Sequence, residues 1–192
     1  GDLTDSKNRH SALLVNRLID GLTSLAPPVY ICKGNHDYRD PANPFFRFLN
    51  HIDGLTFASD PLVVDHGARM GIIPHVRDQA AFDAAVAQCA DADAFLVHQT
   101  FDGAIAETGA RLTGLSASAI EPLKPPLGVW AGDVHKPQRS GLVRYIGCPY
   151  HVRFGDAFTP RVVLLERTGK IKNLRFDAPY KHALKIRSVR DV

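Results

Sequence analysis

The sequence predicts a mixed α/β fold with a layered sheet core, and two observations support this prediction. Segments with helical periodicity first alternate with short apolar runs of the kind that form buried strands, and a β-rich stretch follows. The chain has 192 residues, of which 45% are hydrophobic and 22% are charged. This length and composition suit one globular domain over residues 1–192, with a sizeable core and little room for a second domain.

Two helices and a shorter one are predicted from apolar residues that recur at helical spacing. The first spans about residues 9–25, and its candidate N-caps are Asp5, Ser6 and Asn8. The second follows a capping aspartate and spans about residues 78–90. The shorter helix is expected near residues 45–49.

Short apolar runs between turn residues predict the strands. The expected strands span residues 29–32, 62–64, 70–73, 94–97, 128–131, 143–146, 161–166 and 171–176. The last two are joined by Thr168-Gly169-Lys170, which is typical of a hairpin. Residues 102–127 are rich in Gly, Ser, Thr and Pro, so an irregular segment is expected there.

The composition excludes several classes of protein. No stretch approaches the roughly 20 apolar residues that span a bilayer, and no signal peptide follows Gly1, so no membrane association is expected. The cysteines Cys32, Cys89 and Cys148 are far apart and odd in number, which argues against a disulfide framework and against a zinc knot. A reducing, cytoplasmic location is therefore expected.

The net charge of +3 conceals an uneven distribution along the chain. Residues 1–130 contain 10 Lys and Arg against 15 Asp and Glu, a balance of −5, whereas residues 131–192 contain 13 against 5, a balance of +8. A basic third beside an acidic remainder suits a polyanionic partner, although scattered solvated side chains give the same count.

Three apolar runs each lead into a cluster of polar residues that can bind metal ions. The clusters are Gly34-Asn35-His36-Asp37, His98-Gln99-Thr100 and Gly132-Asp133-Val134-His135. The N-terminal Gly1-Asp2-Leu3-Thr4-Asp5 has a similar composition. Because ligands of open α/β sheets bind beyond the carboxyl ends of the strands, these four loops are expected to converge on one point.

The side chains in these loops offer oxygen and nitrogen ligands without thiolate. Such a set suits manganese, iron, zinc or magnesium. Two divalent ions roughly 3.5–4 Å apart clamp a phosphate and turn bound water into a nucleophile. The sequence therefore predicts a two-metal site for phosphoester chemistry.

These motifs resemble those of the calcineurin-like metallophosphoesterases. The motifs of that family run Asp-x-His, Gly-Asp-x-x-Asp, Gly-Asn-His-Asp/Glu, a lone His and Gly-His-x-His. The last four correspond here to residues 1–5, residues 34–37, His98 and residues 132–135. The resemblance implies a layered fold in which a central β-sandwich is flanked by helices, in the order αββα.

Within that family, the chain is similar to the SbcD-type DNA repair nuclease subunits, above all those encoded by phages. The similar segments are Val97-His98-Gln99-Thr100-Phe101, Gly132-Asp133-Val134-His135-Lys136-Pro137-Gln138 and Tyr145-Ile146-Gly147-Cys148-Pro149-Tyr150. The resemblance implies DNA as the substrate, an SbcC-like ATPase subunit as a partner, and a homodimer. It also implies a bacterial or phage-infected cell as the host.

The resemblance further implies a role for each matching residue. Asp2 bridges two metal ions, Asn35, His98 and Asp133 hold the second ion, and His135 holds the first. The two ions are expected to be manganese, with magnesium, iron and zinc as alternatives. His36 stabilises the phosphate or protonates the leaving oxygen, which suits an imidazole near neutral pH. Asp5 and Asp37 orient the ligands.

The sequence departs from the pattern of the family in two places. No Asp-x-His motif precedes Gly1, so the sequence is expected to lack an N-terminal part of the domain. The last motif has Asp133 where the family has His, which shifts the metal preference toward manganese or magnesium. The DNA-capping region of the nuclease subunits would follow Val192, and none of it is visible.

The first functional hypothesis is metal-dependent hydrolysis of DNA phosphodiesters. Residues that could contact the DNA backbone follow the last motif, and they are Arg139, Tyr150 and Arg153. The second hypothesis is the same chemistry on small-molecule or protein phosphoesters. The third is a scaffold with a degenerate site. The missing first motif supports this hypothesis, and the intact Gly34-Asn35-His36-Asp37 argues against it.

Overall fold

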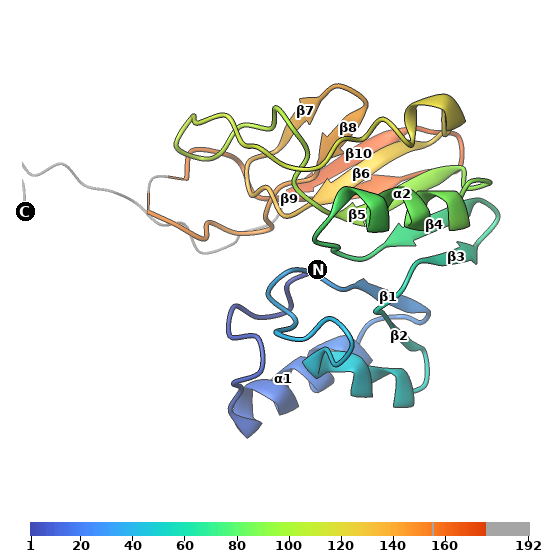
Figure 1. Ribbon diagram of the computed structural model, residues 1–192. Coiled ribbons are helices and arrows are strands. Elements are labelled where there is room, and N and C mark those ends of the chain that lie inside the picture. The colour runs from blue at the N-terminus through green and yellow to red at the C-terminus, as the bar shows by residue number, and fades with distance from the viewer. Residues whose placement is uncertain (155, 176–192) are drawn as a thin grey trace, which may run out of the picture.

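The computed structural model describes residues 1–154 and 156–175, and it has two parts (Figure 1). The larger part contains a six-stranded mixed sheet, and the smaller contains a pair of parallel strands covered by helices. The N-terminus lies between the two parts (Figure 1). The prediction of a mixed α/β architecture is confirmed at this level.

The six-stranded sheet has the strand order β3-β4-β5-β6-β8-β7. Its strands are β3 (Leu62–Asp65), β4 (Arg69–Ile73), β5 (Ala94–His98), β6 (Gly128–Gly132), β7 (Gln138–Ser140) and β8 (Val143–Tyr145). The four central strands are parallel, and the edge strands β3 and β7 run antiparallel to their neighbours. The carboxyl ends of β4, β5 and β6 therefore lie side by side at one edge of the sheet.

The larger hydrophobic core lies between this sheet and helix α2 (Gln79–Gln88). Asp78 caps the helix as predicted, because its side chain accepts a hydrogen bond from the Ala81 backbone N–H. Phe82 is fully buried and packs edge-on against Phe101, with ring centroids 5.3 Å apart. Phe95 of β5 is fully buried in the same core.

The smaller part is built on β1 (Val29–Cys32), which pairs in parallel with β2 (Leu55–Ala58). Helix α1 (Ala12–Thr23) and the 3-10 helix η1 (Phe45–His51) pack against this pair around a second core. That core contains Phe46 and Phe57, each 1% exposed. No residue of α1 is fully buried, so this helix covers the core only from the outside.

The C-terminal strands form a separate antiparallel hairpin, as the sequence predicts. β9 (Arg161–Leu165) pairs with β10 (Ile171–Arg175) across the turn that contains Gly169, whose φ is +80°. The left-handed φ explains why a glycine occupies this turn position. The last predicted strand residue, Phe176, lies outside the described residues.

The structure corrects several local predictions. The N-cap of α1 is Ser11, whose hydroxyl accepts from the Leu14 backbone N–H, so the candidate caps Asp5, Ser6 and Asn8 were wrong. Those three residues belong instead to the loop that follows Asp2. β2 and β7 were not predicted, and residues 102–127 are irregular apart from the short helix η2 (Glu121–Leu123).

None of the helices in the part of the chain that the structure describes has the length and apolar character needed to cross a membrane.

We expect Phe82→Ala to lower the free energy of unfolding by about 3–5 kcal/mol, because it leaves a cavity at a fully buried position. Urea denaturation followed by circular dichroism measures this change. Leu13→Ala is the matched control, since that side chain is 62% exposed, and it should change stability by about 0.5 kcal/mol or less. Equal losses in the two variants would contradict the assignment of the core.

Candidate metal centre

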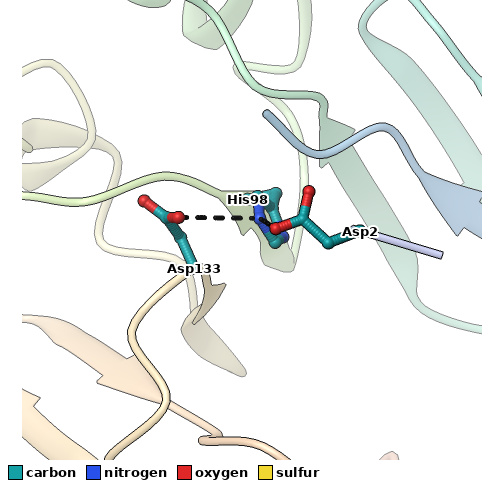
Figure 2. Close-up of side chains that lie close together, drawn as sticks. All are labelled: Asp2, His98 and Asp133. Carbon is teal, nitrogen blue, oxygen red and sulfur yellow. Dashed lines mark hydrogen bonds and ion pairs between the residues drawn. The ribbon is translucent and has the colours of Figure 1, made fainter. Parts of the chain in front are cut away.

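The ends of two adjacent strands and the N-terminal segment bring Asp2, His98 and Asp133 together (Figure 2). His98 is the last residue of β5, and it lies in register with Gly132 at the end of β6. Asp133 follows directly, so its carboxylate approaches His98 from the neighbouring strand. One ligand atom from each of the three residues lies within 4.8 Å of the other two, a group that could hold a metal ion.

The imidazole of His98 lies between the two carboxylates (Figure 2). Its Nε2 is 3.1 Å from Asp2 Oδ2 and 3.8 Å from Asp133 Oδ1. The ring is buried, and both carboxylates are partly buried. Two carboxylates that face one imidazole at low solvent exposure give a negative potential, which attracts a cation.

The Asp2 carboxylate is held in its ionised form. Burial alone would raise its pKa, but the hydrogen bond and charge of His98, together with the His36 backbone N–H, outweigh that rise. The net result is a pKa below the ordinary value of an aspartate. The His36 backbone N–H donates to Asp2 Oδ1 at 2.8 Å, so the loop of residues 34–37 also holds this carboxylate in place.

The position of Asp2 depends on the buried side chain of Asp37. Its carboxylate accepts hydrogen bonds from the backbone N–H groups of Asp2, Leu3 and Gly34, at 3.0, 2.9 and 2.8 Å. Burial raises the pKa of Asp37, although the backbone donors oppose that rise. Asp37 thus ties the N-terminal segment to the turn after β1.

Two glycines allow the chain segments to approach this closely. A Cβ atom at Gly34 would overlap Asp2 Oδ1 and would lie 2.5 Å from the Asp2 backbone nitrogen. A Cβ at Gly132 would lie 2.8 Å from His98 Nδ1. Any side chain at either position would therefore displace a member of the group.

Both aspartates have a left-handed backbone conformation. The φ angle is +59° at Asp2 and +77° at Asp133, a region that few non-glycine residues adopt. Aspartate tolerates this conformation better than most residues, but it still costs free energy. Such strain is found most often at functional sites, and here it occurs on both sides of His98.

The side-chain amide of Asn35 faces the Asp2 carboxylate. One of its two terminal atoms lies 3.0 and 3.2 Å from the two carboxylate oxygens. If the amide nitrogen of Asn35 faces Asp2, it donates a hydrogen bond to the carboxylate. If the amide oxygen faces Asp2, the oxygens of the two side chains can bind the same cation. The structure therefore brings Asn35 to the same group as Asp2, His98 and Asp133.

The other two predicted histidines contact carboxylates outside this group. His36 Nδ1 is 2.7 Å from Asp5 Oδ1, and the Asp5 side chain is 93% exposed. His135 Nδ1 is 3.2 Å from Glu107 Oε1. His135 is thus not part of the group of Asp2, His98 and Asp133, and its role as a ligand of a separate first ion stays a prediction.

The residues predicted to contact DNA lie in different places. Arg139 donates to the Gly141 carbonyl and lines a cavity of about 480 Å³ with Gly128, at the opposite end of β6 from Asp133. Tyr150 is 52% exposed, and its pKa is raised by burial and by the nearby Cys148 and Asp5.

Arg153 is exposed, and its backbone N–H donates to the buried carboxylate of Asp156 at 2.9 Å. The segment that leads to it is joined to the last motif, because the Cys148 N–H donates to the His135 carbonyl. Burial raises the pKa of the Cys148 thiol, which disfavours the nucleophilic thiolate form.

Three further residues near the group were missed in the sequence. The Thr100 hydroxyl donates to Asp133 Oδ2 at 2.5 Å, and Glu107 contacts His135. His75 follows β4 by two residues, and the charges of Asp133, His98 and Asp2 act on its pKa. The signal for His75 was present, because it too is a ligand-type residue just after an apolar strand.

Comparison with known proteins adds no family assignment to this geometry: no family model matches the chain, and no curated protein matches it significantly.

We expect Gly34→Ala to weaken Mn²⁺ binding about 10- to 100-fold, because the added Cβ displaces the Asp2 carboxylate. Electron paramagnetic resonance of free Mn²⁺ measures this affinity. Gly21→Ala in α1 is the matched control, since nothing lies within 4 Å of a Cβ there. That variant should bind Mn²⁺ like the wild type and gain about 0.5–1 kcal/mol of stability. Unchanged affinity in Gly34→Ala would contradict the role of Asp2.

Proposed function

We propose that this protein is a metal-dependent phosphodiesterase that hydrolyses DNA, of the type found in recombination and repair nucleases. One observation carries the proposal: His98 lies between the carboxylates of Asp2 and Asp133 at the carboxyl ends of adjacent strands. The layered metallophosphoesterase fold implied by the sequence motifs is part of the same proposal.

The residues present fit a divalent metal ion. Asp2, Asp133 and His98 supply two carboxylates and one imidazole, and the Asn35 amide adjoins them. The low pKa of Asp2 keeps it a charged ligand at neutral pH. This donor set is mainly oxygen and contains no thiolate, which favours manganese or magnesium over softer ions.

A bound divalent ion would supply Lewis-acid activation of the phosphate and a more acidic bound water. The chain itself would supply the proton for the leaving oxygen, from His36. The backbone of His36 is fixed to Asp2, and its ring nitrogen Nδ1 faces Asp5. These contacts would aim the other ring nitrogen at a phosphate bound beside Asp2.

A two-ion mechanism needs a second set of ligands. Asp2 is the residue expected to bridge two ions. Among the residues that the structure describes, His135 contacts Glu107 and is not part of the group of Asp2, His98 and Asp133. A second ion at Asp2 would therefore need His135 to bind it through Nε2, with Nδ1 still facing Glu107, or further ligands from elsewhere. The residues described here assemble one cation position.

DNA is the proposed substrate because of the uneven charge distribution. The balance of +8 over residues 131–192 suits a phosphate backbone as partner. Tyr150 and Arg153 are exposed and follow the last motif, on the segment hydrogen-bonded to His135. An SbcC-like ATPase partner and a homodimer remain predictions from the resemblance.

Direct tests distinguish two other functions from DNA hydrolysis. A phosphatase acting on small-molecule or protein phosphoesters would use the same metal centre but would ignore DNA. A non-catalytic scaffold would bind no Mn²⁺ and would hydrolyse nothing. The strained, charge-paired arrangement around His98 favours a working metal centre over the scaffold.

We expect hydrolysis of a phosphodiester to require Mn²⁺ and to stop on addition of a chelator. His98→Ala should lose both Mn²⁺ binding and activity, because it removes the central ligand. His36→Ala should keep its Mn²⁺ while its turnover falls about 10²- to 10⁴-fold, the usual contribution of general acid–base catalysis. Metal analysis and kcat for bis(p-nitrophenyl) phosphate measure the two effects.

His66→Ala is the control for these variants, because His66 is exposed and bonds to Tyr30 at 3.0 Å, outside the metal-binding group. It should leave metal content and turnover unchanged. Loss of Mn²⁺ from His36→Ala would instead make His36 a ligand. Metal-free activity in the wild type would refute the proposed mechanism.

We expect DNA binding to weaken with salt and to weaken further in Arg153→Glu. Each lost phosphate contact should lower the slope of log K against log salt by about 0.9 on duplex DNA. Arg139→Glu tests whether the DNA path reaches the far end of β6, and on the sequence prediction it too should weaken binding. Arg17→Glu on exposed α1 is the charge-matched control. Fluorescence anisotropy measures these DNA affinities. Rapid hydrolysis of small phosphoesters by a protein that does not bind DNA would favour the alternative function, a phosphatase acting on small-molecule or protein phosphoesters.

A further inference from the structure

His75 is held between two of the motif loops. It follows the carboxyl end of β4, which lies next to β5 in the sheet. Its backbone N–H donates to the Lys33 carbonyl at 2.8 Å, immediately before the turn that begins at Gly34. The next residue, Val76, donates to the side chain of Gln99, which follows His98. The backbone at His75 and Val76 is thus anchored to the segments that carry Gly34 and His98.

The ring of His75 is oriented by a buried tyrosine. The Tyr38 hydroxyl lies 2.8 Å from His75 Nδ1, and Tyr38 itself is only 2% exposed. Two cations make cation–π contacts with the Tyr38 ring: Lys33 Nζ lies 4.9 Å from the ring centroid, and the Arg77 guanidinium lies 5.2 Å from it. Such contacts immobilise the ring and therefore the direction of its hydroxyl.

The second ring nitrogen of His75 is left for a ligand. Within residues 1–154 and 156–175, Nε2 makes no hydrogen bond, and it is not one of the buried unpaired atoms. We assign the Tyr38 hydroxyl as the donor to Nδ1, and this assignment places the ring proton on Nε2. Nε2 is then a donor that faces solvent at the edge of a half-buried ring.

The strand register places His75 at the sheet edge where His98 ends β5, because Ile73 of β4 pairs with Val97 of β5. Burial lowers the pKa of His75, and the charges of Asp133, His98 and Asp2 are among the influences on it. Lys33 contributes a further charge from the Tyr38 side. The same three residues that could hold a metal are therefore electrostatic neighbours of His75.

We propose that His75 Nε2 donates a hydrogen bond to a non-bridging oxygen of the phosphate bound at the metal centre, and that Tyr38 is the positioning residue that aims it. This assignment rests on the proposed function. A neutral donor suits the role because it adds no charge beside the metal, yet it still binds an anionic oxygen. The same site would recognise the product, inorganic phosphate, or a phosphodiester of any length.

The test compares His75→Ala and Tyr38→Phe with a matched histidine–tyrosine pair. The control variants are His66→Ala and Tyr30→Phe, whose side chains hydrogen-bond at 3.0 Å outside the metal-binding group. For each Mn²⁺-loaded protein, KM and kcat are measured with bis(p-nitrophenyl) phosphate, the affinity for inorganic phosphate by ³¹P relaxation, and the Mn²⁺ affinity separately.

We expect His75→Ala to weaken phosphate affinity and raise KM about 10- to 100-fold, the effect of losing a hydrogen bond to a charged group, with Mn²⁺ affinity unchanged. His75→Gln should recover part of the loss, because its amide nitrogen donates from a similar reach. Tyr38→Phe should raise KM by a smaller factor, and neither control should change it. A purely structural role would not produce this separation of KM from metal affinity.

Two results would overturn the assignment if the wild type is active, and a third case is decided by phosphate affinity. Unchanged phosphate affinity and KM in His75→Ala, with an active wild type, would refute it and leave the proposed function standing. Loss of Mn²⁺ from His75→Ala would make His75 a metal ligand instead. If the wild type hydrolyses no phosphodiester, the proposed function fails, and the affinity for inorganic phosphate alone tests the contact. Weaker phosphate binding in His75→Ala than in the wild type and the controls supports the contact. Equal phosphate affinities in all of these proteins refute it.

Discussion

The buried carboxylate of Asp37 is the interaction on which the rest of the site depends. It accepts hydrogen bonds from three backbone N–H groups, and two of them belong to the N-terminal segment at Asp2 and Leu3. That segment lies in no strand or helix, so this one side chain substitutes for a sheet ladder in fixing it. Removing it would leave buried donors unpaired, at about 1–3 kcal/mol each. Asp2 would then be free to move away from His98.

Charge and conformational strain are concentrated around His98. Two carboxylates face its ring from different loops, and both aspartates have left-handed φ angles. The Thr100 hydroxyl and the His36 backbone N–H each donate a hydrogen bond to one of these carboxylates, which stabilises its ionised form. An arrangement that is costly in the free protein becomes favourable when a divalent ion binds, because the ion replaces repulsion between carboxylates with attraction. Metal binding should therefore also stabilise the fold.

The sheet topology explains why these residues meet. β4, β5 and β6 are adjacent and parallel, so the residues that follow them emerge at one edge: His75, His98 and Asp133. The smaller part supplies the other side of the site through β1 and its turn at Gly34. The Cys32 thiol and the Lys33 carbonyl contact the end of β4 and its loop, at Ile73 and His75. These contacts hold the two parts together beside the metal-binding group.

The sequence by itself determined which residues stand at strand ends and what chemistry they offer. Buried strands are apolar, so the runs before His36, His98 and Asp133 were visible, as was the cap at Asp78. The tertiary structure decided which of these ends converge, because pairing and register depend on contacts between distant segments. It placed His135 beside Glu107, the Arg139 side chain at the cavity next to Gly128, and His75 at the sheet edge where β5 ends. It also produced β2 and β7, which local patterns did not reveal: β7 is a polar edge strand that forms only by pairing with β8.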